Sequence, residues 1–341
     1  YITWLVSVCI NVALEGKIVG GHEATPNSHP YLVSLQTRFL WIRAHVCGGT
    51  LLNERWVLTA AHCVRESWLI RLLPMDAVAG VHDVNEFGSK AQVNTIGQRI
   101  SHPLYEGPLR NKSLLPIFST YSDLTQLIFH LYDSGIGPYD IALLRTVSPF
   151  TFTKEIKPIG LPIDSNIRSQ HLSLVGWGAL RTTTFIPDLP SKLQEVSVTY
   201  IPYDECYNTI NELLEVDEIN PLDEEANICT GPLSGGVAAC SGDSGGPLVH
   251  YMPLAIDQPN DVVEDSTELH NADESNEVIA VLSEENETSG RQYKEDLVPV
   301  VIGVVSWGIS PCGKKGAPTV YTNVTNYIDF INYFLNEQSY I

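Results

Sequence analysis

The sequence predicts an all-β protein that closes with one helix. Its apolar residues fall in short or alternating runs, and turn residues separate these runs, as in sheets built from short strands. A stripe of apolar residues at helical spacing follows near the carboxyl end. The chain has 341 residues, enough to bury a large core. All-β units of about 200–250 residues commonly form one domain.

The expected strands follow one another along most of the chain. They cover residues 31–35, 49–52, 56–59, 175–178, 195–198 and 300–305. The apolar side chains of the expected helix share one face, which we interpret as core packing. The members of this face are Tyr327, Ile328, Ile331, Phe334 and Leu335.

An apolar run, residues 1–14, opens the chain. It is shorter than the roughly 20 apolar residues that span a bilayer. We interpret it as a secretory signal peptide that lacks its first residues, with Ala13 at the cleavage site. A buried strand and a membrane anchor are the alternatives. Residues 297–307 form the next such run and are too short to span a membrane. From the expected signal peptide we predict a secreted protein.

Acidic residues outnumber basic residues. The chain has 40 Asp and Glu against 20 Lys and Arg, a net charge of −20. Nucleic acids and anionic membranes bind basic surfaces, so we expect neither as a partner. We interpret the charge as a feature that favours solubility.

The chain contains seven cysteines. Cys9 lies in the expected signal peptide, and the remaining even number predicts a disulfide framework in a secreted protein. A zinc site is the alternative, but no two cysteines have the CxxC spacing that supports one. The residues alone leave the pairing open.

Three motifs carry candidate catalytic residues: 59–63 (TAAHC), 140–144 (DIALL) and 242–247 (GDSGGP). Together they resemble the chymotrypsin/trypsin family of serine proteases, in which the histidine, aspartate and serine follow in this order. The resemblance covers nearly all of residues 18–338. It implies two six-stranded antiparallel β-barrels with the active site in the cleft between them. It also implies the disulfide bonds Cys47–Cys63, Cys206–Cys229 and Cys240–Cys312.

The resemblance gives each motif residue a role. His62 is the general base, Asp140 orients and stabilises it, and Ser244 is the nucleophile. The backbone N–H groups of Gly242 and Ser244 form the oxyanion hole. No cofactor and no metal are implied. Each residue taken alone has another explanation. His62 could be a core histidine, Asp140 a turn residue, and Ser244 part of the nucleophile elbow of another fold. The three motifs together favour the protease.

Residues 18–21 (IVGG) follow Lys17 and resemble a zymogen activation site. Residues 15–17 then form a short activation peptide, and cleavage after Lys17 frees the amino group of Ile18. The resemblance implies that this ammonium pairs with Asp243, because a buried carboxylate needs a compensating charge. The alternative is that residues 18–21 simply begin a strand.

Specificity is expected from a pocket beside the nucleophile. The resemblance places Ser306, Trp307 and Gly308 on the strand that pairs with the substrate backbone. It places Ala238 at the pocket base, where a trypsin-like protein carries Asp, and Thr319 where glycine usually keeps the pocket deep. We therefore predict cleavage after Leu, Met, Ala, Val or Phe. If Thr319 faces elsewhere, large aromatic residues fit, and a carboxylate from another loop is a further alternative.

Two stretches, 111–134 and 252–297, depart from the family pattern and are interpreted as insertions. Between residues 257 and 296 the second holds thirteen acidic residues against two basic residues, a composition that predicts disorder. Three explanations of the insertions stay open: surface loops, regulatory or binding loops, and translated intron sequence. The intron explanation suits the first stretch best. A calcium site or a basic partner is an alternative for the acidic stretch. Residues 81–90 lack two carboxylates that calcium-binding relatives use, so we expect no calcium there.

Asn111, Asn286 and Asn323 each begin an N-glycosylation sequon, and the first two are expected to be exposed. We predict a secreted, monomeric serine endopeptidase, made as a zymogen, that hydrolyses peptide bonds after apolar residues through an acyl-enzyme intermediate. Its expected partners are protein or peptide substrates, an activating protease that cuts after Lys17, and protein inhibitors. The alternative is a non-catalytic binding protein on the same fold, with a cleft obstructed by the insertion at 111–134.

Overall fold

The computed structural model describes residues 18–39, 42–65, 72–107, 137–163, 172–180, 189–214, 218–253 and 297–336. Several sequence predictions concern residues outside these ranges. They are the signal peptide 1–14, the activation peptide 15–17, the insertion 111–134, residues 254–296 of the second insertion, and the sequons at Asn111 and Asn286. The barrels and the helices lie in the compact unit formed by residues 18–251 and 299–336, and of the second unit, 252–298, only two strand ends are described.

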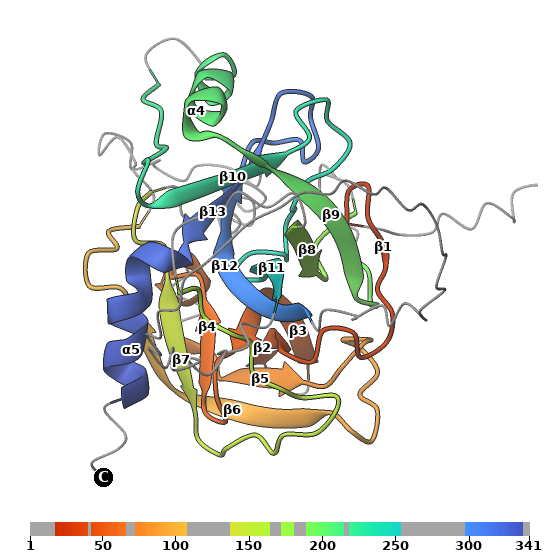
Figure 1. Cartoon of the computed structure of the whole chain (residues 1–341). Helices are drawn as coiled ribbons and strands as arrows, with labels where there is room; N and C mark the ends of the chain where they lie inside the picture. Colours follow the sequence, from red (N-terminus) through yellow and green to blue (C-terminus); the bar gives the residue numbers. More distant parts are fainter. Residues whose placement is uncertain are drawn as a thin grey trace, which may run out of the picture. The chain divides into compact units, whose positions relative to one another are not determined.

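The first six long strands close into an antiparallel barrel (Figure 1). The order around the barrel is β2-β3-β4-β7-β6-β5, so β7 returns to pair with β4 and β6. The strands are β2 (Leu32–Phe39), β3 (Ile42–Leu51), β4 (Trp56–Thr59), β5 (Met75–Ala79), β6 (Gln92–Ser101) and β7 (Ala142–Thr146).

The next six strands form a second antiparallel barrel. Their order is β9-β10-β13-β12-β11-β8, and the pairing of β8 with β9 closes the ring. The short β1 (His22–Glu23) adds to the outer edge of β9. The strands are β8 (Leu172–Gly176), β9 (Gln194–Ile201), β10 (Asn227–Gly231), β11 (Pro247–Pro253), β12 (Leu297–Gly308) and β13 (Thr319–Asn323). The predicted pair of six-stranded barrels is confirmed.

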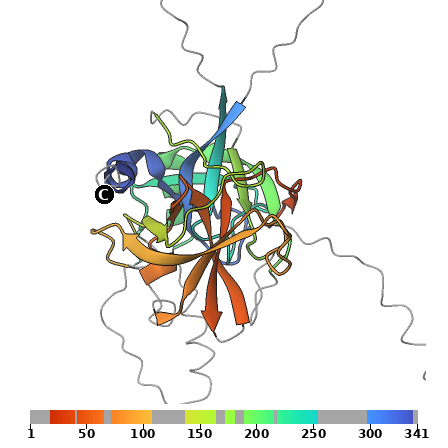
Figure 2. The same cartoon turned by 90° about the horizontal axis from the view of Figure 1, so that it is seen from below.

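The two barrels occupy separate parts of the unit. In Figures 1 and 2 the red-to-yellow strands of the first barrel lie on one side and the green-to-blue strands of the second on the other. Burial follows the strand pattern: in β9 the side chains of Val196 and Val198 are buried and that of Ser197 is exposed. In β4 and β10 all side chains are buried.

The predicted carboxyl-terminal helix is present as α5 (Ile328–Asn336), preceded by one 3₁₀ turn, η1 (Val324–Tyr327). Tyr327 and Ile331 are buried, and the other three members of the predicted face pack against the core from partly buried positions. A further helix, α4 (Tyr203–Asn211), was not predicted. Only Cys206 and Ile210 are buried on it, which is too short a stripe to be recognised as helical spacing.

Candidate active site

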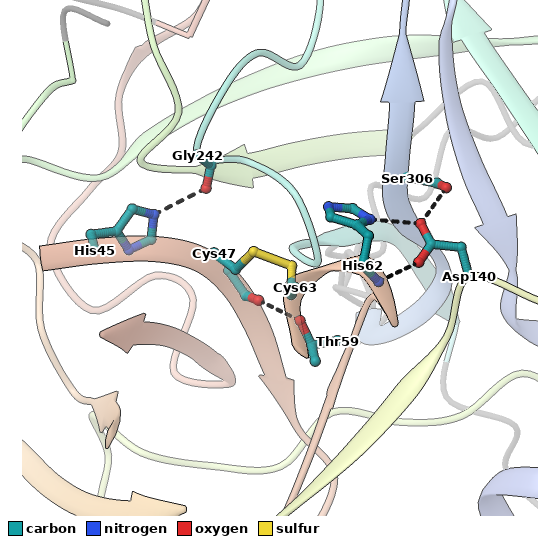
Figure 3. The surroundings of a disulfide bond; sticks show 9 residues. His45, Cys47, Thr59, His62, Cys63, Asp140, Gly242 and Ser306 are labelled. Carbon is teal, nitrogen blue, oxygen red and sulfur yellow. Dashed lines mark hydrogen bonds and ion pairs between the residues drawn. A yellow bond between two sulfur atoms is a disulfide. The ribbon is translucent and has the colours of Figure 1, made fainter. Parts of the chain in front are cut away.

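A histidine and an aspartate from the first barrel form the centre of the site. His62 begins α1 (His62–Arg65), the single turn that follows β4, and Asp140 lies just before β7. The His62 Nδ1 atom lies 2.8 Å from Asp140 Oδ2, and the His62 backbone N–H donates to Oδ1 at 2.9 Å (Figure 3). Both side chains are buried. A proton on Nδ1 is thus held by the carboxylate, and Nε2 becomes the ring atom that accepts a proton.

The same carboxylate receives a third hydrogen bond, from Ser306 in β12. The Ser306 hydroxyl donates to Asp140 Oδ2 at 2.6 Å (Figure 3). Sequence reasoning placed Ser306 on the substrate strand and did not connect it with Asp140. The signal that the sequence offers is a serine directly after the apolar run 300–305, because a hydroxyl buried there needs a hydrogen-bond partner, but this signal does not identify Asp140.

The Ser244 loop lies against the segment that carries the histidine. In β3 the Gly48 N–H donates to the Ser244 carbonyl at 2.8 Å. A methyl group built on Gly245 would lie 2.1 Å from Thr59 Oγ1 and 3.1 Å from Cys63 Sγ, so only glycine fits there. Ser244 itself is half-buried. The three sequence motifs therefore converge on one site.

Gly242, the first residue of the loop motif, has a φ of +101°, which favours glycine. Its carbonyl accepts a hydrogen bond from His45 Nε2 at 3.0 Å, and His45 Nδ1 lies 2.8 Å from Ser34 Oγ. Burial lowers the pKa of His45 to about 4, against the opposing effect of the Gly242 carbonyl, so the ring is neutral near pH 7. Sequence reasoning did not single out His45, which fixes the orientation of the peptide after Gly242.

Asp243 is buried, and its carboxylate lies beside Gly176 and Gly178, at and just after the end of β8. Its Oδ1 accepts from the Gly178 N–H at 2.8 Å, and its Oδ2 accepts from the Cys240 N–H at 3.0 Å. Burial raises the pKa of Asp243 to about 7, although both backbone hydrogen bonds lower it. A methyl group on Gly176 or Gly178 would lie 2.2 or 2.1 Å from the carboxyl group of Asp243, so only glycine at these two positions leaves room for that side chain.

The predicted activation segment packs beside the base of the predicted pocket. Ile18 is fully buried, and Val19 forms an antiparallel bridge with Ala238. The Ala238 N–H donates to the Val19 carbonyl at 3.4 Å. Residue 18 is thus buried, and residue 19 pairs with the segment that contains Ala238.

The predicted pocket residues lie on facing strands and loops. Thr319 in β13 is buried and pairs with Gly308 in β12. Its hydroxyl accepts a hydrogen bond from the Ala239 N–H at 3.0 Å, next to Ala238. A methyl group on Gly308 would meet only the Pro318 carbonyl, at 3.7 Å, so that position is open. The Thr319 side chain therefore contacts the Ala238–Ala239 segment.

The part of the chain that the structure describes contains three disulfide bonds, with the same partners that the resemblance implied: Cys47–Cys63, Cys206–Cys229 and Cys240–Cys312. The first is adjacent to His62 (Figure 3). Within the described ranges, one group of side chains has ligand atoms close enough to hold a metal, namely Cys47, His62 and Cys63. Its two sulfurs are bonded to each other, so they are not thiolate ligands.

With this geometry in place, comparison with known proteins defines the class. The chain matches the Trypsin family over residues 18–255 and 289–331. It belongs to the trypsin family of serine proteases. Similar proteins include lectizyme of Glossina austeni (27% identical, over 90% of this chain and 82% of that protein) and kallikrein-1 of Mus musculus (27%, 93% and 89%). Trypsin II-P29 of Gallus gallus is also 27% identical, over 96% of each chain.

Among the described residues, every helix is too short or too polar to cross a membrane.

Proposed function

We propose that the chain is the precursor of a secreted serine endopeptidase that acts on protein or peptide substrates. In this proposal residues 1–14 are the signal peptide, 15–17 the activation peptide and 18–338 the protease domain. The observation that carries the proposal is the buried His62–Asp140 pair beside the Ser244 loop. Membership of the trypsin family supports it.

The proposed reaction has two matched halves. His62 Nε2 takes the proton of Ser244 Oγ as this oxygen attacks the peptide carbonyl, and Asp140 stabilises the resulting imidazolium. The Gly242 and Ser244 N–H groups bind the oxyanion, and His62 then gives its proton to the leaving amine. A water molecule then attacks the acyl-enzyme carbonyl while His62 takes its proton. His62 returns a proton to Ser244 Oγ, and the carboxylic acid is released.

The proposed zymogen step rests on Asp243. In the uncleaved chain its carboxylate is buried with two backbone donors, and its pKa is raised to about 7. Cleavage after Lys17 would provide the ammonium of Ile18, a residue that is already buried next to the Val19–Ala238 bridge. That cation would stabilise the ionised carboxylate and the loop that follows it.

The proposed specificity rests on Thr319. Because its hydroxyl bonds to the Ala239 N–H, the side chain fills space between β13 and the residue 238 segment. Ala238 supplies no charge for Lys or Arg. These two features favour small and medium apolar side chains, such as Ala, Val, Leu and Met, over Phe.

A serine-directed phosphonate tests the proposed activity. Protein cleaved after Lys17 should be labelled at Ser244, while uncleaved protein and the Ser244→Ala variant should not be labelled. Peptide mapping by mass spectrometry locates the adduct. A folded, cleaved chain that takes no label and cleaves no peptide library would support the binding protein instead.

A peptide library with one varied residue before the scissile bond tests the pocket. We expect Thr319→Gly to raise the rate for Phe relative to Ala by roughly 10–100-fold, because the removed atoms open the pocket. Thr199→Gly, on an exposed strand position of β9, controls for the general effect of glycine in a strand. Preference of the parent enzyme for Arg or Lys would contradict this assignment of Ala238.

A further inference from the structure

The residue before Asp140 has an unusual backbone. Tyr139 has a φ of +65°, in the left-handed region, which tyrosine seldom adopts. Within the described ranges the other non-glycine residue with positive φ is Asn27, a residue type that tolerates this region. Tyr139 must therefore be held in place by its surroundings.

The conformation of Tyr139 determines how Asp140 is presented. The Ile141 N–H donates to the Tyr139 carbonyl at 2.8 Å, so Asp140 is the central residue of a three-residue turn. The Asp140 carbonyl accepts from the Thr322 hydroxyl at 2.8 Å. A change at Tyr139 would rotate the turn and re-aim the carboxylate that binds His62.

Tyr327 holds Tyr139 from the carboxyl-terminal segment. The Tyr139 N–H donates to the Tyr327 hydroxyl oxygen at 3.2 Å. The Tyr139 ring stacks on His102, with 4.9 Å between centroids and 12° between planes, and Tyr327 meets both rings edge-on at 6.0 and 5.4 Å. The His102 N–H donates to the Ile141 carbonyl at 2.9 Å, which ties this cluster to the same turn.

We infer that Tyr139 and Tyr327 are positioning residues for Asp140, and that the segment from β13 to η1 sets the aim of the catalytic carboxylate. Thr322 and Tyr327, both from this segment, hold the turn on its two sides, one at the carbonyl of Asp140 and one at the N–H of the preceding residue. This inference rests on the proposed function, because it assigns Asp140 to the triad.

Tyr327→Phe is the sharpest variant, since it removes the acceptor of the Tyr139 N–H and keeps the ring. We expect kcat to fall about tenfold, because one hydrogen bond to a buried backbone group is lost, with KM changed less than about twofold. Tyr333→Phe, on the exposed side of α5, removes a hydroxyl from the neighbouring helix and should leave kcat unchanged.

Tyr139→Asn supplies the second variant, because asparagine adopts positive φ with less strain. In this background the added Tyr327→Phe change should lower kcat by less than about threefold, so the two positions are coupled. Equal losses of kcat in both backgrounds, or a Tyr327→Phe enzyme with unchanged kcat, would overturn the inference.

A spectroscopic measurement separates this inference from the proposed function. The proton between His62 Nδ1 and Asp140 can be followed by NMR in the Ser244→Ala background, which needs no activity. We expect Tyr327→Phe to shift this resonance or speed its exchange, and Tyr333→Phe to leave it in place. An unmoved resonance would overturn the positioning role, whereas failure of phosphonate labelling in the parent would reject only the proposed activity.

Discussion

Two buried aspartates differ in how their charge is compensated. Asp140 receives the His62 N–H, a contact from His62 Nδ1 and the Ser306 hydroxyl, so a group that can become cationic lies beside it within the fold. Asp243 receives two backbone N–H groups, and burial raises its pKa to about 7. Folding thus places a titratable partner beside Asp140, whereas the printed contacts of Asp243 are backbone N–H groups. In the proposed function, cleavage after Lys17 would supply the missing cation for Asp243.

The largest loss of kcat is expected at Asp140, the aspartate that lies beside the titratable side chain of His62. Asp140→Asn should lower kcat of the cleaved enzyme by about 10⁴-fold, the magnitude that the same substitution has in the reference enzyme of this mechanism. An amide at this place favours the wrong tautomer of His62. Steady-state kinetics on a peptide substrate give the value, and Asp204→Asn on the exposed face of α4 is the control. A loss below tenfold would remove Asp140 from the triad.

Asp243→Asn should have the next largest effect. In cleaved protein the variant removes the proposed partner of the Ile18 ammonium and leaves that cation buried, so kcat/KM should fall by about 10²–10³-fold. Phosphonate labelling rates and peptide hydrolysis should fall together. If cleaved Asp243→Asn protein kept full activity, the second aspartate would have no role in activation.

The pH dependence of the uncleaved chain tests the same comparison without catalysis. Because the pKa of Asp243 is raised in the folded state from 3.8 to about 7, the folded chain binds the proton more tightly than the unfolded chain. Its contribution to the free energy of unfolding is therefore greatest below pH 4 and is lost as the pH rises through 7, by roughly 4 kcal/mol at most.

Denaturant unfolding of the parent and of Asp243→Asn at several pH values measures this contribution as a difference. In uncleaved protein, the parent should become less stable than Asp243→Asn as the pH rises from 4 to 7. After cleavage at Lys17 this loss of stability should be smaller. A parent chain that gained stability relative to the variant over this range would contradict the raised pKa.

The smallest effect is expected from Ser306→Ala. The loss of one donor to the Asp140 carboxylate should reduce kcat about tenfold, because His62 remains as the principal partner. Ser197→Ala, at an exposed position of β9, is the matched control. A loss as large as that of Asp140→Asn would mean that Ser306 does more than support the carboxylate.

Residue patterns alone could predict strands and the final helix, and the three motifs predicted the barrels and the triad. Beyond the triad and the disulfide bonds that the resemblance implied, they could not reveal contacts between residues distant in the chain. Ser306 and Asp140 are 166 residues apart, and His45 and Gly242 are 197 apart, so no local spacing reports these hydrogen bonds. The left-handed Tyr139 was also missed, because its conformation depends on Tyr327 and His102 and not on its own preference.

The Cys240–Cys312 bond encloses residues 254–296, since its two cysteines are 72 positions apart. A protease that nicks the chain anywhere in that stretch would cut the backbone without releasing either piece. The nicked protein would migrate as one species until a reductant separates two fragments, the amino-terminal one carrying Ser244 and the carboxyl-terminal one carrying Ser306 and the closing helix.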